Sequence, residues 1–450
     1  MPAAPAPATG SPGTAQATTR ARRLCAVALT GVLVAAGAPG VAVAATPSGT
    51  TLRAALSGWT SAHHGTSALV WRLDPDGPTP ILAYRPDVPR LPASTMKVVT
   101  AAGALIGLGP SFRFETRLYA GAGAVRRGRV LHGPLYLVGG GDPVLATPAY
   151  LRRFLGGRGT SLGRIVRPLR SQGVRLVRGP IVADESVFDA RRQGPRWKSS
   201  YRFECSPLSG LSVNENFAGE WRGGYVPWPS LAAARRLRQV MTAMGVRQRG
   251  DLRAGRAPRN ARLVGSVGSP PLSTIVGIMN RDSDNFIAEM LVKDVGSHRM
   301  GRGSTAAGTA ANARLLREMG ILVPGDRLVD GSGLSRDNRL TASSLVRLLA
   351  AADADPTWGR ALIGSLARGG EGTLRRRFTS PAVSRRVRAK TGYIGGVSSL
   401  TGVVTSTSGA RYAFALLMND WDISGARATQ DRVVALLARG AGDRLGPLPG

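Results

Sequence analysis

Short segments near both ends of the chain alternate between apolar and polar residues, which is typical of strands that bury one face. Near the beginning, residues 68–73 and 80–84 show this pattern on either side of a turn rich in proline and glycine. Near the end, residues 385–391, 397–405 and 411–419 alternate in the same way. We therefore predict a pair of strands early in the chain and three strands of an antiparallel sheet late in it.

Other segments carry apolar residues at the spacing of helices that bury one side. Residues 96–108 have this spacing soon after the first two strands. The spacing returns after about residue 271 and predicts four further helices, over 286–295, 304–319, 342–352 and 426–440.

The middle of the chain has a different texture, richer in strands. Residues 113–120, 129–138 and 174–183 have strand character, and residues 150–172 have helical character. Residues 197–229 are irregular and rich in Trp, Tyr, Pro and Gly. Because both ends combine strands with helices around this block, the simplest architecture is one α/β (α+β) domain with a β-rich insertion.

The chain has 450 residues, more than one ordinary domain needs. We place the first part of the α/β domain at residues 45–110 and its second part at 269–450. Residues 111–268 would form the inserted domain, as a single unit or as two subdomains.

The first 44 residues have the pattern of an export signal. Arg20, Arg22 and Arg23 precede an apolar run over 24–36, and Ala42-Val43-Ala44 matches a cleavage site. Cleavage would remove Cys25 and leave Cys205 as the remaining cysteine, which we expect to be a buried apolar residue. An uncleaved membrane anchor is the alternative, although the apolar run is short for one.

The net charge is +33, which predicts attraction to anionic wall polymers or a membrane surface. An even spread of arginine can equally reflect genomic base composition. No motif for nucleic-acid binding accompanies the charge, so we expect no nucleic-acid partner. The four histidines form no cluster with cysteine, so neither a metal nor another cofactor is expected.

Lysine is rare, although basic residues are abundant. Only Lys97, Lys198, Lys293 and Lys390 occur among 60 basic residues. Lysine can act as a base when burial lowers its pKa, whereas arginine stays charged. Lys97 and Lys390 stand in short strings with chemical meaning, whereas we expect Lys198 and Lys293 at the surface.

Ser94 and Lys97 are three residues apart where a predicted helix begins, so their side chains share one face. A serine hydroxyl needs a base to become a nucleophile, and a lysine one turn away can be that base. Repulsion from Lys390 would help to lower the pKa of Lys97. The alternative is an ordinary turn of a surface helix.

Two further strings are weak signals when each is taken alone. Ser283-Asp284-Asn285 precedes a helix, where it could pass a proton and hold a carbonyl, or simply cap the helix. Lys390-Thr391-Gly392 lies on a predicted strand, where Lys390 and Thr391 could hold a carboxylate. Gly392 would let a substrate approach the backbone closely. The alternative is a strand that ends at glycine.

Together the strings occur in the order S-x-x-K, S-x-N and K-T-G, which is the signature of β-lactamases and penicillin-binding proteins. The chain resembles the D-alanyl-D-alanine carboxypeptidases among the low-molecular-mass class C penicillin-binding proteins. The likeness extends over about residues 51–437 and includes four further segments, at 137–143, 210–216, 330–335 and 371–374. It implies a β-lactamase/transpeptidase-like domain, with an antiparallel sheet flanked by helices and a large inserted domain.

The resemblance also implies a role for each site residue. Ser94 would be the nucleophile, Lys97 its base and Ser283 a proton shuttle. Asn285 would orient the substrate, while Lys390 and Thr391 would bind its terminal carboxylate. The amides of Ser94 and Tyr393 would form the oxyanion hole, and Asp284 would be structural. Tyr393 departs from the small residue usual after K-T-G and would reshape the mouth of the pocket.

The leading hypothesis is a secreted or wall-associated serine enzyme that hydrolyses the D-Ala–D-Ala bond of peptidoglycan stem peptides. Penicillins would acylate the same serine, and D,D-endopeptidase activity on cross-links is a close variant. A class A-like β-lactamase is a rival, weakened by the long insertion and by the lack of a convincing Glu-containing loop for deacylation. A non-catalytic cationic wall-binding protein is the third hypothesis.

Overall fold

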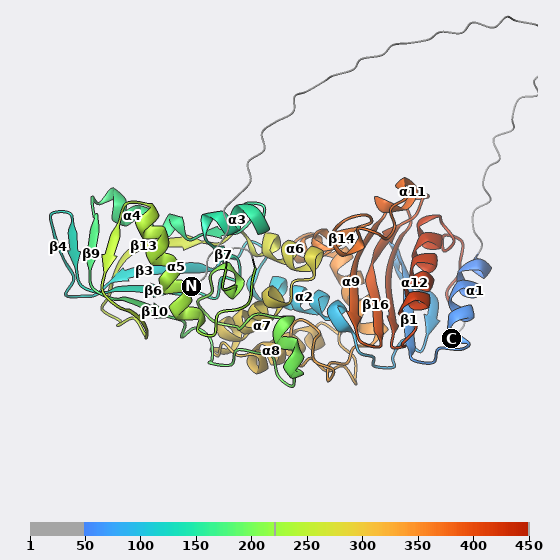
Figure 1. Cartoon of the computed structure of the whole chain (residues 1–450). Coiled ribbons are helices and arrows are strands. Elements are labelled where there is room, and N and C mark those ends of the chain that lie inside the picture. Colours follow the sequence, from blue (N-terminus) through green and yellow to red (C-terminus); the bar gives the residue numbers. More distant parts are fainter. Residues whose placement is uncertain (1–48, 220–221, 449–450) are drawn as a thin grey trace, which may run out of the picture. The chain divides into compact units, whose positions relative to one another are not determined.

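The computed structural model describes residues 49–219 and 222–448 (Figure 1). The predicted export signal, including Cys25 and the cleavage site, lies outside these residues, so it stays a prediction. Within the described residues, no helix is both long enough and apolar enough to cross a membrane.

One six-stranded sheet joins the two ends of the chain. Its strand order is β14-β15-β16-β17-β1-β2, and consecutive neighbours pair in antiparallel fashion. In the pair between β1 and β17, Val70 lies opposite Phe414. The strands are β1 (Thr66–Asp74), β2 (Gly77–Tyr84), β14 (Ala367–Arg368), β15 (Val387–Ile394), β16 (Val397–Thr405) and β17 (Arg411–Met418). The predicted pair and the predicted antiparallel triplet therefore belong to a single sheet.

Helices cover both faces of this sheet, so its central strands are buried on both sides. On β17, Phe414 and Leu416 face α1 (Gly49–Thr60) and α12 (Ile423–Ala438). Ala415 and Leu417 of the same strand belong to the core on the opposite face, which contains α9 (Ala342–Ala354) (Figure 1). Burial on both faces explains why β17 is apolar almost throughout.

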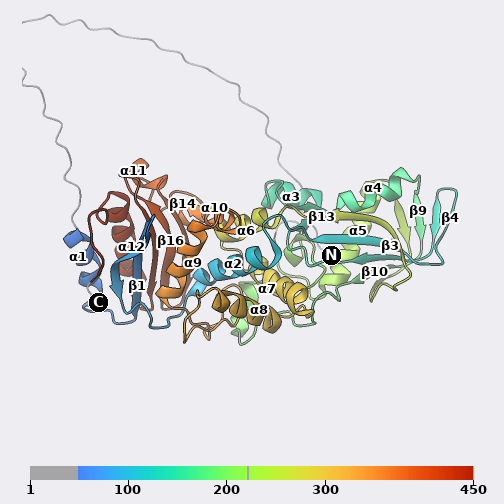
Figure 2. The same ribbon diagram turned by 180° about the vertical axis from the view of Figure 1, so that it is seen from behind.

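A group of helices packs together on the α9 side. Figure 2 shows α2 (Met96–Leu108) among them, and it packs against α7, α8 and α10. The group also contains α6 (Leu272–Asp282), α7 (Asn285–Met300), α8 (Thr305–Glu318) and α10 (Trp358–Ser365). The 13 residues of α2 are apolar apart from Lys97 and Thr100, and they run through the core, which makes the helix a rigid support for its first turn.

The middle of the chain forms separate sheets with their own apolar core. One sheet has the order β12-β10-β6-β3-β13, and another has the order β11-β9-β5-β4. Several pairs in both sheets are parallel, for example β10 with β6 and β9 with β5. The strands are β3 (Glu115–Ala120), β4 (Val125–Arg127), β5 (Val130–His132), β6 (Leu135–Val138), β9 (Leu176–Arg178), β10 (Ile181–Asp184), β11 (Arg247–Arg249), β12 (Leu252–Ala254) and β13 (Arg262–Gly268). The domain boundaries near residues 110 and 268 stay a prediction.

Three expectations for this region were wrong in detail. Residues 129–138 form β5 and β6, because Gly133-Pro134 breaks the ladder, and Gly179-Pro180 likewise separates β9 from β10. Residues 150–172 are not one helix but α3 (Pro148–Phe154) and α4 (Gly163–Ser171), with short strands β7 (Leu145–Ala146) and β8 (Thr160–Ser161) beside them.

The helix α5 (Pro229–Ala243) was not predicted. Two further short helices are α11 (Pro381–Ser384) and, within the irregular segment, the 3₁₀ helix η2 (Ser199–Phe203).

Candidate active site

The three sequence strings meet at one place, between α2, the start of α7 and strand β15. Ser94 lies in a 3₁₀ turn, η1 (Ala93–Thr95), which leads directly into α2. Ala93 in this turn has a left-handed φ of 46°, a conformation that costs energy for a residue with a side chain. The oxygen of Pro92 holds the turn by accepting hydrogen bonds from the Thr95 hydroxyl at 2.7 Å and the Ser399 hydroxyl at 2.6 Å.

Lys97 is fully buried in the first turn of α2, and its Nζ is hydrogen-bonded to three groups. Nζ donates to Ser94 Oγ at 3.0 Å, to Asn285 Oδ1 at 2.7 Å and to the Ser332 carbonyl at 2.8 Å. A neutral amine has two N–H groups and one lone pair. If Asn285 and Ser332 take the two N–H groups, the lone pair faces the Ser94 hydroxyl. The site therefore suits a lysine that accepts the serine proton.

Burial lowers the pKa of Lys97 to about 8. The nearby carboxylates of Asp330, Asp284 and Glu289 act in the opposite direction and keep the pKa from falling further. Burial is thus the main cause of the lowered pKa, and the additional repulsion expected from Lys390 is not among its causes. Burial also lowers the pKa of Lys390 well below its ordinary value, and the charge of Lys97 adds to this effect.

If Lys97 is the base, its neutral form is the reactive one, so we expect acylation of the free enzyme to accelerate as the pH rises to about 8. Below this pH, each unit should reduce the second-order rate constant about tenfold, in proportion to the neutral fraction of the lysine. Stopped-flow acylation by a chromogenic β-lactam between pH 6 and 9 measures this. A profile without slope in that range would exclude Lys97 as a base with this pKa.

The serine and asparagine of the second string occupy the junction between two helices. Ser283 ends α6 in a left-handed conformation, and its Oγ accepts a hydrogen bond from Lys390 Nζ at 2.9 Å. Asp284 caps α7 by accepting a hydrogen bond from the amide of Ile287. Asn285 is the first residue of α7, and its Nδ2 donates to the Glu204 carbonyl at 2.9 Å. The structure thus places Ser283 and Asn285 against the two lysines.

The third string lies on β15, as predicted. Lys390 is fully buried, and its Nζ donates to Ser283 Oγ and to the Thr391 carbonyl. Gly392 has a role in packing, and its expected role in substrate approach stays a prediction. A Cβ at this position would collide with Ser399 Oγ and would lie 2.7 Å from the Pro92 carbonyl and 3.1 Å from the Ser94 amide. The missing side chain therefore lets β15 pack against the turn that carries Ser94.

The expectation for Lys293 was wrong, whereas Lys198 is exposed as expected. The Lys293 side chain is 1% exposed, forms an ion pair with Asp189, and donates to the Arg191 carbonyl at 2.9 Å. Lys293 belongs to α7, whereas Asp189 lies in the connection between β10 and η2. Lys293 therefore ties α7 to the middle of the chain.

Removing Asp189 should destabilise the fold more than removing Lys293. Asp189→Ala leaves a buried ammonium without its ion pair, whereas Lys293→Met replaces the cation with an apolar side chain of similar length. Breaking a fully buried pair costs about 3–5 kcal/mol. Because the Asp189 side chain is 35% exposed, we expect a loss of about 2 kcal/mol for Asp189→Ala. Urea unfolding of both variants measures the difference, and equal losses would contradict this account.

Two acidic residues outside the three strings support the site. Glu289 is fully buried in α7, and its Oε1 accepts the amides of Gly331 at 3.0 Å and Ser332 at 2.7 Å. Burial raises the pKa of Glu289 to about 8. Asp330 accepts the amides of Gly333 and Ser335 and the Trp197 indole N–H. Glu289 and Asp330 together fix the loop whose Ser332 carbonyl contacts Lys97. The sequence analysis identified the segment 330–335, but it did not identify Glu289.

Cys205 is buried, as expected, and burial raises the pKa of its thiol. Among residues 49–219 and 222–448, His, Cys, Asp and Glu form no group that could hold a metal ion.

Comparison with known proteins gives one consistent family. The model of the D-Ala-D-Ala carboxypeptidase 3 (S13) family matches residues 67–219 and 225–440. A D-alanyl-D-alanine carboxypeptidase of an Actinomadura species is 30% identical, over 78% of this chain and 77% of its own length. A carboxypeptidase of Mycobacterium tuberculosis is 33% identical, over 76% and 74%. Penicillin-binding protein 4 of Haemophilus influenzae has a similar fold, with a TM-score of 0.70 at 24% identity over 85% of this chain and 98% of that one.

Proposed function

Because this chain belongs to the D-Ala-D-Ala carboxypeptidase 3 (S13) family, and is a serine-type carboxypeptidase and penicillin-binding protein, we propose that Ser94 forms its acyl-enzyme. The contact of Lys97 Nζ with Ser94 Oγ, Asn285 Oδ1 and the Ser332 carbonyl is the observation that carries the proposal. It supplies a nucleophile, a base and an orienting amide within one set of hydrogen bonds.

Acylation begins when neutral Lys97 takes the proton from Ser94 Oγ, which attacks the carbonyl of the penultimate D-alanine. The amides of Ser94 and Tyr393 receive the developing oxyanion. Each such donor typically stabilises the transition state by about 3–4 kcal/mol. The Ser94 amide lies beside Gly392, so strand and turn are close enough for two donors to converge.

The C–N bond then breaks, and the leaving amine needs a proton. Ser283, whose Oγ contacts Lys390 Nζ, relays it: its hydroxyl gives a proton to the amine and regains the proton that Lys97 took from Ser94, so that Lys97 is neutral again. Water later attacks the acyl-enzyme, adds hydroxide to the acyl carbon and returns the proton to Ser94. Lys390 and Thr391 hold the terminal carboxylate of the substrate. A bound carboxylate raises the pKa of Lys390 again, because it stabilises the ammonium form.

The substrates that fit this chemistry are peptidoglycan stem peptides, with hydrolysis of the D-Ala–D-Ala bond or of the equivalent bond in cross-links. β-Lactams carry a strained amide and a carboxylate in the same relation, so they acylate the same serine. The relative from Haemophilus influenzae has been seen in complex with a β-lactam. We place the activity outside the cytoplasm, where the wall lies, and the positive charge favours retention there.

The family assignment decides against the non-catalytic wall-binding hypothesis and against a β-lactamase. The stable acyl-enzyme of a penicillin-binding protein gives the direct test. Unaltered protein incubated with a fluorescent penicillin should keep a covalent label on Ser94 after denaturing electrophoresis. Ser94→Ala should show none, while Ser399→Ala, which keeps the nucleophile, should still label. Labelling of Ser94→Ala would overturn the assignment.

A further inference from the structure

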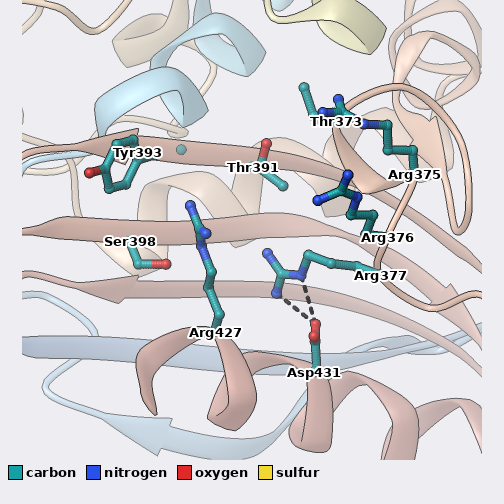
Figure 3. A pocket seen from close by; sticks show the side chains of 10 residues that line it. Thr373, Arg375, Arg376, Arg377, Thr391, Tyr393, Ser398, Arg427 and Asp431 are labelled. Carbon is teal, nitrogen blue, oxygen red and sulfur yellow. Dashed lines mark hydrogen bonds and ion pairs between the residues drawn. The ribbon is translucent and has the colours of Figure 1, made fainter. Parts of the chain in front are cut away.

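A cationic cavity opens directly beside the strand that carries Lys390-Thr391-Gly392. It has a volume of about 340 Å³, near the lower end of the range for ligand sites, roughly 300–1,000 Å³. Thr391 and Tyr393 of β15 form one wall, and Arg427 of α12 approaches from below in Figure 3. The segment Arg375-Arg376-Arg377, which follows the 3₁₀ turn η4 (Gly372–Leu374), closes the other side.

Four guanidinium groups line this cavity, but Asp431 is its one carboxylate. Asp431 is occupied by Arg377, whose Nε donates to it at 2.8 Å and whose Nη2 donates to Gln430 at 3.1 Å. In the described part of the chain, the side chains of Arg376 and Arg427 form no hydrogen bond or ion pair, and the Arg427 guanidinium lies over the ring of Tyr393, 5.2 Å from its centroid. Figure 3 shows both guanidinium groups reaching toward the strand near Thr391. The cavity therefore has a strong unbalanced positive charge.

The position of the cavity assigns it to one side of the scissile bond. Under the proposed function, Thr391 contacts the terminal carboxylate, which belongs to the leaving residue. The cavity reaches Thr391, but its lining does not include Ser94, Lys97, Ser283 or Asn285. A group bound there belongs to the leaving part of the substrate.

A single D-alanine would not use these arginines, because Lys390 and Thr391 already hold its one carboxylate. We propose that the cavity binds a second carboxylate of the leaving group, so that this enzyme favours cross-linked stem peptides over peptides that release only D-alanine. This inference rests on the proposed function. The reaction is the same hydrolysis: the amide C–N bond breaks, the leaving amine takes a proton, and water completes the acid.

Tyr393 contributes to this preference through its side chain. The ring is 60% exposed and lies against the Arg427 guanidinium, which it holds toward the cavity. A small residue at this position, as is usual after K-T-G, would leave Arg427 without this support. The departure from the usual motif thus coincides with the cationic wall.

The test compares two substrates with the full chain: a short peptide ending in D-Ala–D-Ala, and a dimeric muropeptide joined through a D-alanyl cross-link. The double variant Arg376→Gln/Arg427→Gln should lower kcat/KM for the dimer about tenfold, consistent with losing charge-assisted hydrogen bonds. Its kcat/KM for the short peptide and its rate of penicillin acylation should change less than about twofold. Arg432→Gln, an exposed arginine on the same helix and outside the cavity, is the matched control and should change neither.

Equal losses for both substrates, or no loss for the dimer, would overturn the proposal. It would also be overturned if the double variant loses binding to soluble poly(glycerol phosphate) while the ratio between the substrates stays the same, because the cavity would then be a polymer site. Failure of the proposed function would be visible separately, as missing penicillin label on Ser94 in the unaltered chain.

Discussion

Lys97→Arg should abolish acylation, whereas Lys390→Arg should leave a measurable rate. The two lysines are equally buried, with no exposed surface, so the same substitution introduces the same excess volume at both positions. Arginine keeps its proton at any working pH and cannot accept one from Ser94. Loss of a general base typically costs about 10²–10⁴ in rate, and the added bulk beside Ser94 places the expected loss at the upper end.

At position 390 the guanidinium preserves the charge that would hold a carboxylate. The loss there should be about 10–100-fold, because the planar group cannot reproduce the contacts of Nζ with Ser283 Oγ and the Thr391 carbonyl. The second-order rate constant for penicillin acylation measures both variants, and circular dichroism with thermal unfolding shows whether each one folds. If folded Lys97→Arg acylates as fast as Lys390→Arg, Lys97 is not the base.

Gly392→Ala should slow acylation strongly, although it replaces no side chain that takes part in the chemistry. The new methyl group would collide with Ser399 Oγ and press on the Pro92 carbonyl, which holds the turn before Ser94. Either β15 or the turn must then move by a large fraction of an ångström. A displacement of 1 Å between reacting groups can cost about 10²-fold in rate, which is the loss we expect.

The double variant Gly392→Ala/Ser399→Ala separates this packing effect from any other. Removing the Ser399 hydroxyl relieves the worst contact, although the Pro92 carbonyl stays close. Part of the acylation rate should return in the double variant, while Ser399→Ala alone should slow acylation only slightly. If the second substitution restores nothing, the collision with Ser399 is not the cause of the defect.

The sequence predicted best those elements whose signals are local. The helix at 96–108 and the strand at 397–405 have the predicted bounds, because each has one clear period and ends at glycine or polar residues. The ranges 129–138 and 174–183 were each predicted as one strand, but each contains two shorter strands. Their Gly-Pro pairs are visible in the sequence, but whether a ladder continues across such a pair depends on partners elsewhere in the chain.

The same limit explains which parts of the site could be foreseen. Ser94 and Lys97 are one helical turn apart, so their contact follows from spacing alone. Glu289 has no such signal, since the amides that it binds are at 331 and 332 and only the folded chain brings them together. Lys293 was misplaced for a related reason: Asp189, which makes its burial tolerable, is about a hundred residues away. The cationic cavity also joins α12, β15 and the segment after η4, which no local pattern connects.

The pairing of β1 with β17 has a consequence for how the enzyme is made. Ser94, Ser283 and Lys390 all precede residue 411, so a growing chain contains the proposed catalytic groups before the strand between β1 and β16 exists. A contact between residues as distant as Val70 and Phe414 carries a large loop-closure entropy and forms late in folding. The β15–β16 hairpin must wait for β17 before it joins β1, and the site has no rigid support until then. We therefore expect activity to depend on completion of β17. A chain that ends before β17 would have every proposed catalytic group but could not hold these groups in a reactive arrangement.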